Sequence, residues 1–406
     1  MGSIYSIVIM LALIAFISWL NYRLLSRWFD LYRTRAVKVT YQLFSVITII
    51  VLGYGWTTQP RFAASDQKVY VFLFYGTLIW LLGQILLLVF QPFIYAAHRL
   101  ITREKETDAQ DIKSTKFSMT RRIFLHKTLA ITPLIAFGFS TRGIFEAQFD
   151  MIVEHHSLVI PTLPINLNGL KIGQISDTHL GTYFDLEKLD KVIKLLIQQK
   201  PDLVVITGDF VDDLNLLKSA IDRINELQPL IPYGIYFCYG NHEYYRNIDL
   251  IRAELDKSHL VVLNNTNRLI VPGQQPFYLM GVDYPWANDA RRGINVSAST
   301  RQQYFAQASQ NIPSDAFKVL IAHHPDCLMD GFAAQIPLTL AGHTHGGQVS
   351  IWGRTLQSSY TYMRGLYQEN GVYGYVSRGA GHWFPFRFGC PPEITIFTLL
   401  VKEPTR

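Results

Sequence analysis

The chain has 406 residues, a formal net charge of +6, 17% charged residues and 49% apolar residues. At roughly 150 residues per domain this length allows two or three domains, and the composition excludes disorder, collagen and coiled coil as the main architecture. The three cysteines, Cys238, Cys327 and Cys390, form no CxxC pair, so neither a disulfide scaffold nor a thiolate zinc site is expected.

The positive charge is concentrated in the first third of the chain. Residues 1–143 carry 16 Lys and Arg against 6 Asp and Glu, a net charge of +10, whereas residues 144–406 carry 21 basic and 25 acidic residues, a net charge of −4. Because the basic excess lies in loops between apolar stretches, it indicates membrane orientation. We expect no nucleic acid partner, since the basic residues do not belong to a folded soluble face.

The first third also contains long apolar stretches. Three of them carry no charged residue: residues 4–20, 39–56 and 69–97. A fourth uncharged stretch, residues 128–140, is shorter, and the span that contains it is expected near residues 123–140. Seventeen helical residues extend about 26 Å, close to the bilayer core of about 30 Å. We predict an all-α membrane region of about four transmembrane helices over residues 1–143, followed by a soluble domain over residues 144–406. The first three stretches contain no Asp, Glu, Lys, Arg or His, which favours anchoring over transport.

The positions of Lys and Arg predict the orientation of this region. The loop after the first stretch carries five basic residues and the loop after the third carries seven, whereas the loop between the second and third carries only Arg61 and Lys68. Loops rich in Lys and Arg stay in the cytoplasm, so the N-terminus is expected outside. The soluble domain is then extracytoplasmic if the fourth stretch crosses the bilayer, and cytoplasmic if that stretch only lies on its surface.

One short segment favours export. Residues 120–125, Thr-Arg-Arg-Ile-Phe-Leu, precede an apolar run and resemble a twin-arginine export signal. Ordinary cytoplasmic anchoring by Arg121 and Arg122 is the alternative, and both interpretations give the same topology. We predict an integral protein of the bacterial inner membrane with an extracytoplasmic soluble domain.

In the soluble part, short apolar runs alternate with helical stretches such as residues 186–199 and 214–227, which predicts a layered α/β domain. Five apolar runs each end in a polar cluster: residues 170–175, 203–206, 235–238, 319–322 and 338–340. Ligands of open α/β sheets bind beyond the carboxyl ends of the strands. The five clusters are therefore expected to converge on one site.

The clusters contain metal ligands and no cysteine: Asp177, His179, Asp209, Asn241, His323, His343 and His345. A mixed oxygen and imidazole set suits Mn, Fe or Zn better than Mg or Ca. The Asp-x-His and His-x-His spacings place alternate side chains on one side of an extended segment. Seven ligands exceed what one tetrahedral ion needs and suit two divalent ions, which together activate a hydroxide for in-line attack on a phosphate.

Five motifs together resemble the calcineurin-like metallophosphoesterase family, over roughly residues 150–400: Asp177-x-His179, Gly208-Asp209, Gly240-Asn241-His242-Glu243, His323 and Gly342-His343-x-His345. Further motifs at residues 175–181, 343–348 and 377–393 resemble the membrane-associated or exported bacterial branch of that family. The resemblance implies a four-layer α/β/β/α sandwich and a dinuclear phosphoesterase site.

The resemblance also implies a role for each matching residue. One metal would be held by Asp177, His179, Asp209 and His345, and the other by Asp209, Asn241, His323 and His343, with Asp209 bridging. His242 matches a histidine that contacts the phosphate and protonates the leaving oxygen, and Asn241 would help it to stabilise charge there. Asp212 and Glu243 would orient these groups.

Two features of the C-terminal part stay open at this point. Residues 381–388 contain four aromatic residues and Arg387, which predicts either ordinary core packing or an interfacial lip for lipid substrates. Arg378 and Arg387 are candidates for gripping a phosphate from the surface. The motifs name no other substrate-binding residue.

We therefore expect an enzyme, a membrane-anchored and metal-dependent phosphohydrolase that cleaves phosphate mono- or diesters. Tethering to the lipid bilayer favours a lipid-linked phosphoester, and a soluble phosphodiester or nucleotide is the competing substrate. The alternative function is a non-catalytic membrane adaptor that uses the sandwich as a binding platform. The complete ligand set disfavours it.

Overall fold

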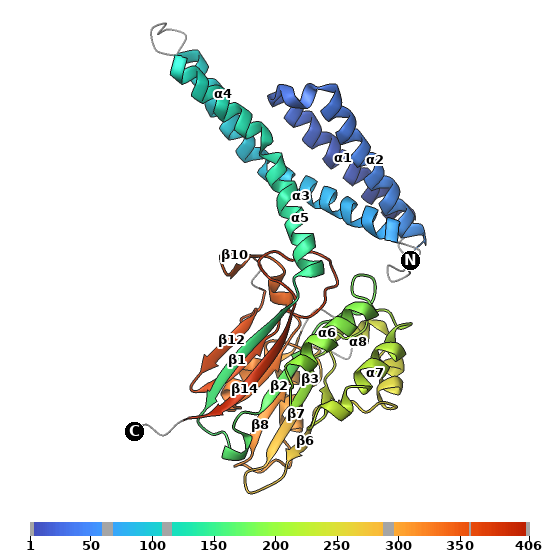
Figure 1. The fold of residues 1–406 in the computed structure, drawn as a ribbon, viewed down its shortest axis with the longest axis vertical. Coiled ribbons are helices and arrows are strands. Elements are labelled where there is room, and N and C mark those ends of the chain that lie inside the picture. Colours follow the sequence, from blue (N-terminus) through green and yellow to red (C-terminus); the bar gives the residue numbers. More distant parts are fainter. Residues whose placement is uncertain (1–3, 59–67, 108–115, 287–295, 357–358, 403–406) are drawn as a thin grey trace. The chain divides into compact units, whose positions relative to one another are not determined.

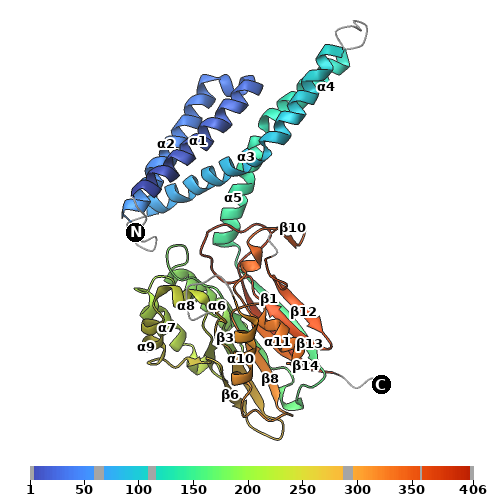
Figure 2. The ribbon, with the colours of Figure 1, turned by 180° about the vertical axis from the view of Figure 1, so that it is seen from behind.

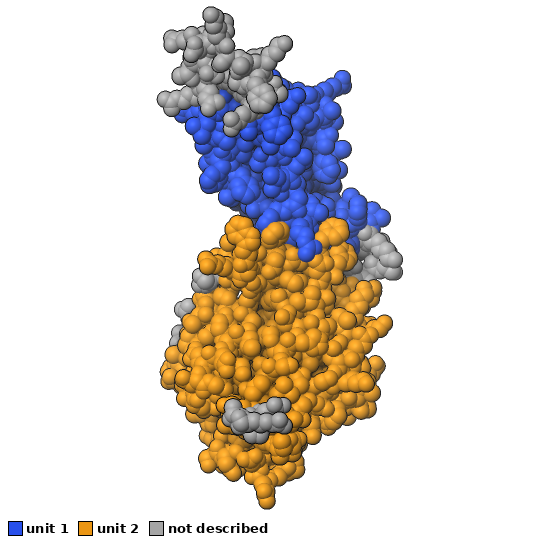
Figure 3. Space-filling view, turned by 60° about the vertical axis from the view of Figure 1, so that its left-hand side comes forward, with its two compact units in different colours: residues 1–144 blue, residues 145–406 orange. Residues whose placement is uncertain are grey.

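The computed structural model describes residues 4–58, 68–107, 116–286, 296–356 and 359–402. Arg61, one of the two basic residues of the second predicted loop, lies outside them. The chain forms two compact units, residues 1–144 and residues 145–406 (Figure 3). Each unit is described below by itself.

The first unit is helical. Its helices, together with the helix that leads into the second unit, are α1 (Ile4–Trp28), α2 (Arg35–Thr58), α3 (Lys68–Thr107), α4 (Lys116–Ile131) and α5 (Pro133–Phe149), and the 3-10 turn η1 (Asp30–Arg33) follows α1. α4 ends just before Pro133, whose nitrogen cannot donate to the preceding turn.

Four segments of the described residues are long and apolar enough to cross a membrane: Tyr5–Trp28, Arg35–Trp56, Val69–Ile101 and Ile123–Phe149. This confirms the predicted number of apolar helices. Each segment runs beyond its predicted stretch at one end, because polar residues there continue the helix. The fourth extends to Phe149, nine residues beyond its predicted end.

The second unit contains two six-stranded sheets (Figure 1). The first sheet has the order β1-β14-β2-β3-β4-β5, with β1 (Ile152–Ile160), β14 (Glu393–Val401), β2 (Lys171–Ile175), β3 (Leu203–Ile206), β4 (Ile235–Phe237) and β5 (Val261–Val262). The second has the order β12-β13-β9-β8-β7-β6, with β12 (Gly365–Glu369), β13 (Val372–Val376), β9 (Leu338–Ala341), β8 (Phe317–Ile321), β7 (Phe277–Gly281) and β6 (Thr266–Val271). A small hairpin joins β10 (Ser350–Ile351) to β11 (Arg354–Thr355).

Helices cover the outer faces of both sheets. The helices of this unit are α6 (Leu186–Gln198), α7 (Leu217–Asn225), α8 (Asn241–Arg246), α9 (Ile248–Leu255), α10 (Ala298–Ala308) and α11 (Cys327–Ala333), with 3-10 turns η4 (Ile165–Leu167), η5 (Gln228–Leu230) and η6 (His345–Gly347). α6, α7 and α9 pack on the first sheet. α10 and α11 pack on the second, as the view from behind shows (Figure 2). The layers therefore follow the predicted order α/β/β/α.

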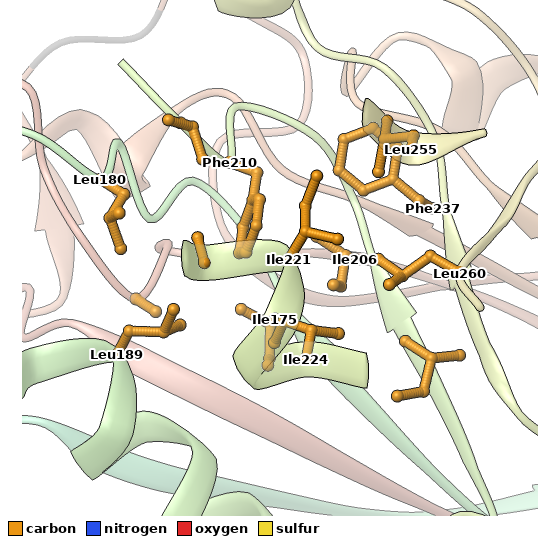
Figure 4. Packing of buried hydrophobic residues seen from close by; sticks show 14 of the residues in the cluster. Ile175, Leu180, Leu189, Ile206, Phe210, Ile221, Ile224, Phe237, Leu255 and Leu260 are labelled. Atoms are coloured by element: carbon orange, nitrogen blue, oxygen red, sulfur yellow. The ribbon is translucent and has the colours of Figure 1, made fainter. Parts of the chain in front are cut away.

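Strand β3 shows why the layers pack as they do. Leu203 and Val205 point between the sheets, whereas Val204 and Ile206 point toward the helices. All four are buried, as expected of a central parallel strand covered on both faces. The helix-side cluster gathers Ile175, Ile206, Phe210, Ile221, Ile224, Phe237 and their neighbours (Figure 4).

The predicted helices of this unit are confirmed, with one shift. α6 begins at Leu186 because Asp185 caps it by accepting a hydrogen bond from the Lys188 N–H at 2.9 Å. α7 begins at Leu217, three residues later than predicted. The Asp213 carboxylate accepts from the Asn215 N–H at 3.0 Å and holds a turn where the helix was expected to start.

The core packing predicts the effect of Phe237→Ala. This side chain is 1% exposed in the helix-side cluster, so its truncation should lower the free energy of unfolding by about 3–5 kcal/mol. Urea unfolding of the full-length protein in detergent, followed by tryptophan fluorescence, measures this change. Leu230→Ala is the control, since Leu230 is 56% exposed and should change stability by less than about 0.5 kcal/mol. Equal losses for the two variants would contradict the described core.

Candidate metal centre

All seven predicted metal ligands lie just beyond the carboxyl ends of strands. In the first sheet Asp177 and His179 follow β2, Asp209 follows β3 and Asn241 follows β4. In the second sheet His323 follows β8, and His343 and His345 follow β9. The two sheets therefore contribute to one site at a shared edge, as the sequence predicted.

Five of these residues have a left-handed backbone. Their φ angles are +50° at Asp177, +47° at His179, +52° at Asp209, +74° at His343 and +50° at His345. Each such conformation costs a non-glycine residue about 1–3 kcal/mol and persists only where the surroundings hold it. The turns after β2, β3 and β9 therefore keep a strained backbone, which directs the donor side chains toward the site.

The Glu243 carboxylate connects the turn after β3 to the turn after β4. It accepts hydrogen bonds from the N–H groups of Gly240 at 2.7 Å, Asp209 at 3.0 Å and Phe210 at 2.7 Å. A Cβ at Gly240 would stand 2.2 Å from Asp209 Oδ1, so only glycine allows this approach. Glu243 therefore fixes the turn after β3 against the turn after β4.

The first group of donors comprises Asp177, His179 and His345, whose ligand atoms all lie within 4.8 Å of one another. The Nε2 atoms of His179 and His345 face each other at 3.0 Å, and His345 Nε2 lies 3.6 Å from Asp177 Oδ1. Two imidazole nitrogens and a carboxylate oxygen converging on one point form a set that a transition-metal ion satisfies.

The second group comprises Asp209, His323 and His343, again within 4.8 Å. His323 Nε2 lies 3.2 Å from Asp209 Oδ2 and 3.2 Å from His343 Nδ1. Asp209 Oδ2 also lies 3.6 Å from His179 Nε2 of the first group. Asp209 thus stands between the two groups.

Asn241 and His242 begin α8 beside these donors. The Asn241 Oδ1 atom is buried and has no hydrogen-bond partner among the described residues, which is costly unless a ligand completes it. His242 Nδ1 lies 2.8 Å from Asp212 Oδ1, and Asp212 Oδ2 lies 3.4 Å from His179 Nδ1. Asp212 therefore contacts both histidines, and Arg246 contacts it in turn at 3.1 Å.

The electrostatics of the site fit divalent cations. Burial, together with the charge of Arg387, lowers the pKa of His345, and burial with the charge of His323 lowers the pKa of His343. Both imidazoles are neutral near pH 7, the form that binds metals. At His323 burial is outweighed by Asp209 and Asp177, which raise its pKa to about 10. The carboxylates of Asp209 and Asp177 thus favour positive charge at His323.

Arg387 and Arg378 do not lie where the sequence suggested. Arg387 is fully buried, and its guanidinium lies 2.9 Å from His345 Nδ1 while donating to the carbonyls of His345 and Gly381. The expectation of a surface phosphate grip is wrong for Arg387, which is fully buried. Arg378 is instead held in ion pairs by the carboxylates of Glu393 and Glu154.

The aromatic segment around Arg387 is mixed. Phe386 is buried, whereas Trp383 is 55% exposed, so the segment is neither wholly core nor wholly lip. Two further neighbours of the site escaped the sequence analysis: the Tyr360 hydroxyl lies 2.9 Å from His343 Nε2, and the Tyr284 ring lies 5.6 Å from the His343 ring. Lone tyrosines in loops carry no motif that would have marked them.

Comparison with known proteins agrees with this geometry. The profile of the "Calcineurin-like phosphoesterase" family matches residues 170–347, a range that contains all seven predicted metal ligands. An "Uncharacterized metallophosphoesterase YkuE" of Bacillus subtilis is 31% identical over 292 residues, which cover 69% of this chain and 98% of that protein. The chain therefore belongs to the calcineurin-like phosphoesterase family.

Two other relatives add detail. The "Phosphodiesterase YaeI" of Escherichia coli is 28% identical over 291 residues, covering 70% of this chain and all of that protein. A "Transmembrane protein with metallophosphoesterase domain" of Bos taurus is 29% identical over 291 residues, covering 68% of this chain and 63% of that protein. The chain is thus a membrane protein with a metal-dependent phosphoesterase domain, and its enzyme class is hydrolase.

The position of Glu243 predicts the effect of Glu243→Gln. An amide accepts through one oxygen only, so at least one of the three backbone N–H groups loses its partner. The turns after β3 and β4 should then hold the metal ligands less rigidly. Affinity for Mn(II), measured by calorimetric titration of the full-length protein, should fall about 10- to 100-fold. Glu187→Gln is the matched control, since the Glu187 side chain is 78% exposed. Unchanged metal affinity in Glu243→Gln would contradict the bracing role.

Proposed function

We propose that this protein is a membrane-anchored phosphohydrolase that binds two divalent metal ions and cleaves phosphate mono- or diesters. The observation that carries the proposal is the convergence of the two donor groups on Asp209, whose Oδ2 atom lies 3.2 Å from His323 and 3.6 Å from His179. A carboxylate between two sets of imidazoles suits a bridging ligand. The domains we propose are a membrane anchor over residues 1–143 and a phosphoesterase over residues 144–406.

We assign the ligands as two sets. Asp177, His179, Asp209 and His345 would hold one ion, and Asp209, Asn241, His323 and His343 would hold the other. Mn, Fe or Zn suits these donors. When bound, such ions supply positive charge for the phosphate and lower the pKa of a water molecule.

His242 and Asn241 act on the phosphate itself. His242 has its Nδ1 atom fixed by Asp212 at 2.8 Å, which leaves Nε2 to face the leaving oxygen and to protonate it. The amide of Asn241 and the imidazole of His242 stabilise charge on the phosphate oxygens. Asp212 and Glu243 act only by orienting their neighbours.

We propose a phosphoester substrate that is linked to lipid. Two contacts within the second unit support this. The Gln148 side chain lies 2.9 Å from His382 Nε2, and the Glu146 carboxylate accepts from the Cys390 N–H at 2.6 Å. The last turn of α5, which ends the fourth candidate membrane segment at Phe149, is therefore fixed near the strand ends that carry the metal ligands. The name of the Escherichia coli relative favours diester hydrolysis.

A non-catalytic membrane adaptor is the alternative. It is disfavoured because every ligand position holds a residue that can bind metal. The purified protein would show little or no bound metal if the adaptor function were correct.

Two variants test the proposed chemistry. Asp209→Ala should lose both ions and reduce Mn(II)-dependent hydrolysis of p-nitrophenyl phosphate and bis(p-nitrophenyl) phosphate to the background of the assay. His242→Ala should keep two metals per chain, measured by elemental analysis, and lose about 10²- to 10⁴-fold in turnover.

Matched controls for these variants are Asp249→Ala and His259→Ala, which change exposed residues and should leave turnover unaltered. The assay uses the full-length protein in detergent. Full activity in Asp209→Ala would refute the assignment, and the ratio of the two ester rates gives the preferred class.

We propose that the phosphoesterase domain lies outside the cytoplasm of a bacterial cell, at the inner membrane. A cysteine introduced at Lys257, which is 68% exposed, should react with a membrane-impermeant maleimide on intact spheroplasts. A cysteine at Arg33, 58% exposed in the first loop, should react only after permeabilisation. The opposite pattern would place the domain in the cytoplasm.

A further inference from the structure

The second unit contains a cavity of about 510 Å³ beside α6, on residues that the metal centre does not use. Its apolar part includes Phe184, Val192 and Ala380, which are at most 2% exposed. Phe149, which is 73% exposed, lies at its rim. None of the metal ligands lines the cavity. It is therefore a separate site from the metal centre.

Three lysines also line the cavity. Lys188, Lys191 and Lys194 are spaced three residues apart on α6 and so lie along one face of the helix. The described residues that line the cavity include no Asp or Glu. The cavity thus combines an apolar wall with a cluster of positive charge.

Lys188 makes no ion pair with a described carboxylate, and the charges of Asp185 and Glu187 offset only part of the effect of burial on its pKa. Its half-buried ammonium donates to the Tyr183 carbonyl at 2.6 Å and to the Gln148 amide oxygen. Both acceptors are neutral, and no carboxylate of the described residues lies within ion-pair distance of it. Burial lowers the pKa of Lys188 to about 8. A desolvated cation held only by neutral oxygens favours an anion beside it.

The neighbouring lysines increase this preference. Lys191 is paired with Glu187 at 2.9 Å but remains 67% exposed, and Lys194 is exposed without a hydrogen bond or ion pair to a described residue. Both can turn toward an anion in the cavity, since long lysine side chains keep their ammonium groups mobile while the stem packs on apolar surface.

The surroundings of the cavity indicate which anion this is. Phe149 is both a lining residue and the last residue of the fourth candidate membrane segment, so the cavity begins where the chain leaves the hydrocarbon region. A soluble anion needs no apolar wall, whereas a membrane phospholipid presents a phosphate and the first carbons of its acyl chains together. Anionic lipids attract each lysine near the membrane surface by about 1 kcal/mol.

We propose that the cavity beside α6 binds an anionic phospholipid, with the phosphate at Lys188, Lys191 and Lys194 and the acyl chains against Phe149 and Phe184. This site is distinct from the metal centre and does not depend on catalysis. A bound lipid would hold α6 at the lipid surface, and thereby the turn before it that carries Asp177 and His179.

Native mass spectrometry of the full-length protein, released from detergent micelles that contain phosphatidylglycerol, tests the proposal. In Lys191→Glu/Lys194→Glu the affinity for the first phosphatidylglycerol should fall at least about tenfold, whereas binding of phosphatidylcholine should not change. The matched control is Lys218→Glu/Lys257→Glu, since these lysines are 74% and 68% exposed and each is paired with an acidic neighbour, as Lys191 is. An equal loss in the control would show general surface attraction and refute the site.

Lys188→Met separates binding from folding. Because the change removes a partly desolvated charge that has no ion-pair partner, the melting temperature should stay the same or rise while phosphatidylglycerol affinity falls. A lower melting temperature with unchanged lipid affinity would assign Lys188 a structural role and overturn the proposal. Glycerol 3-phosphate, added as a competitor at equal concentration, should not displace the lipid. Complete displacement would identify a site for soluble phosphates instead.

Discussion

The buried carboxylates of Asp177 and Asp209, only 0% and 2% exposed, set the constraint on which the rest of the phosphoesterase domain depends. Like charges in a dry site repel strongly and remain ionised only beside compensating cations. The domain supplies imidazoles at 3.2–3.9 Å from these carboxylates and aims them through left-handed turns. Buried central strands such as β3 support those turns. A strained backbone conformation persists only where the surrounding structure holds it in place.

Much of this arrangement could be predicted from the sequence, because the physics is local. Strand β3 was predicted over its observed residues, since it is apolar on both faces and is followed by Thr207 and Gly208. The metal ligands could be found because each follows such a run. The buried position of Arg387 could not be predicted, because its partners are backbone carbonyls and a ring nitrogen that only the folded chain brings to it. The start of α7 was predicted too early because a side-chain turn at Asp213 competes with the first helical turn.

Contacts between the helices of the first unit also could not be predicted from the sequence. Its apolar stretches could be recognised by length, but no motif in them indicates how the helices recognise one another. Asn21 of α1 donates to the Gln84 side chain of α3 at 2.8 Å, and Tyr41 of α2 donates to the same oxygen at 2.6 Å. Gln91 donates back to Asn21 at 3.1 Å. In lipid, where apolar contact alone selects no partner, each such bond contributes about 1 kcal/mol. These polar residues therefore serve association of the helices, and the absence of charge among them agrees with an anchor.

The direction of β1 determines at which edge of the sandwich the second unit begins. β1 pairs in parallel with β14, with Ile152 opposite Glu393, and β14 runs antiparallel to β2, with Thr395 opposite Gln174. The start of β1 therefore lies beside the end of β2, where Asp177 follows. Had β1 run the other way, its nine residues would have carried the chain about 30 Å to the opposite edge. The observed direction therefore places Ile152 at the edge that carries the metal donors, and the proposal of a lipid-linked substrate depends on this direction.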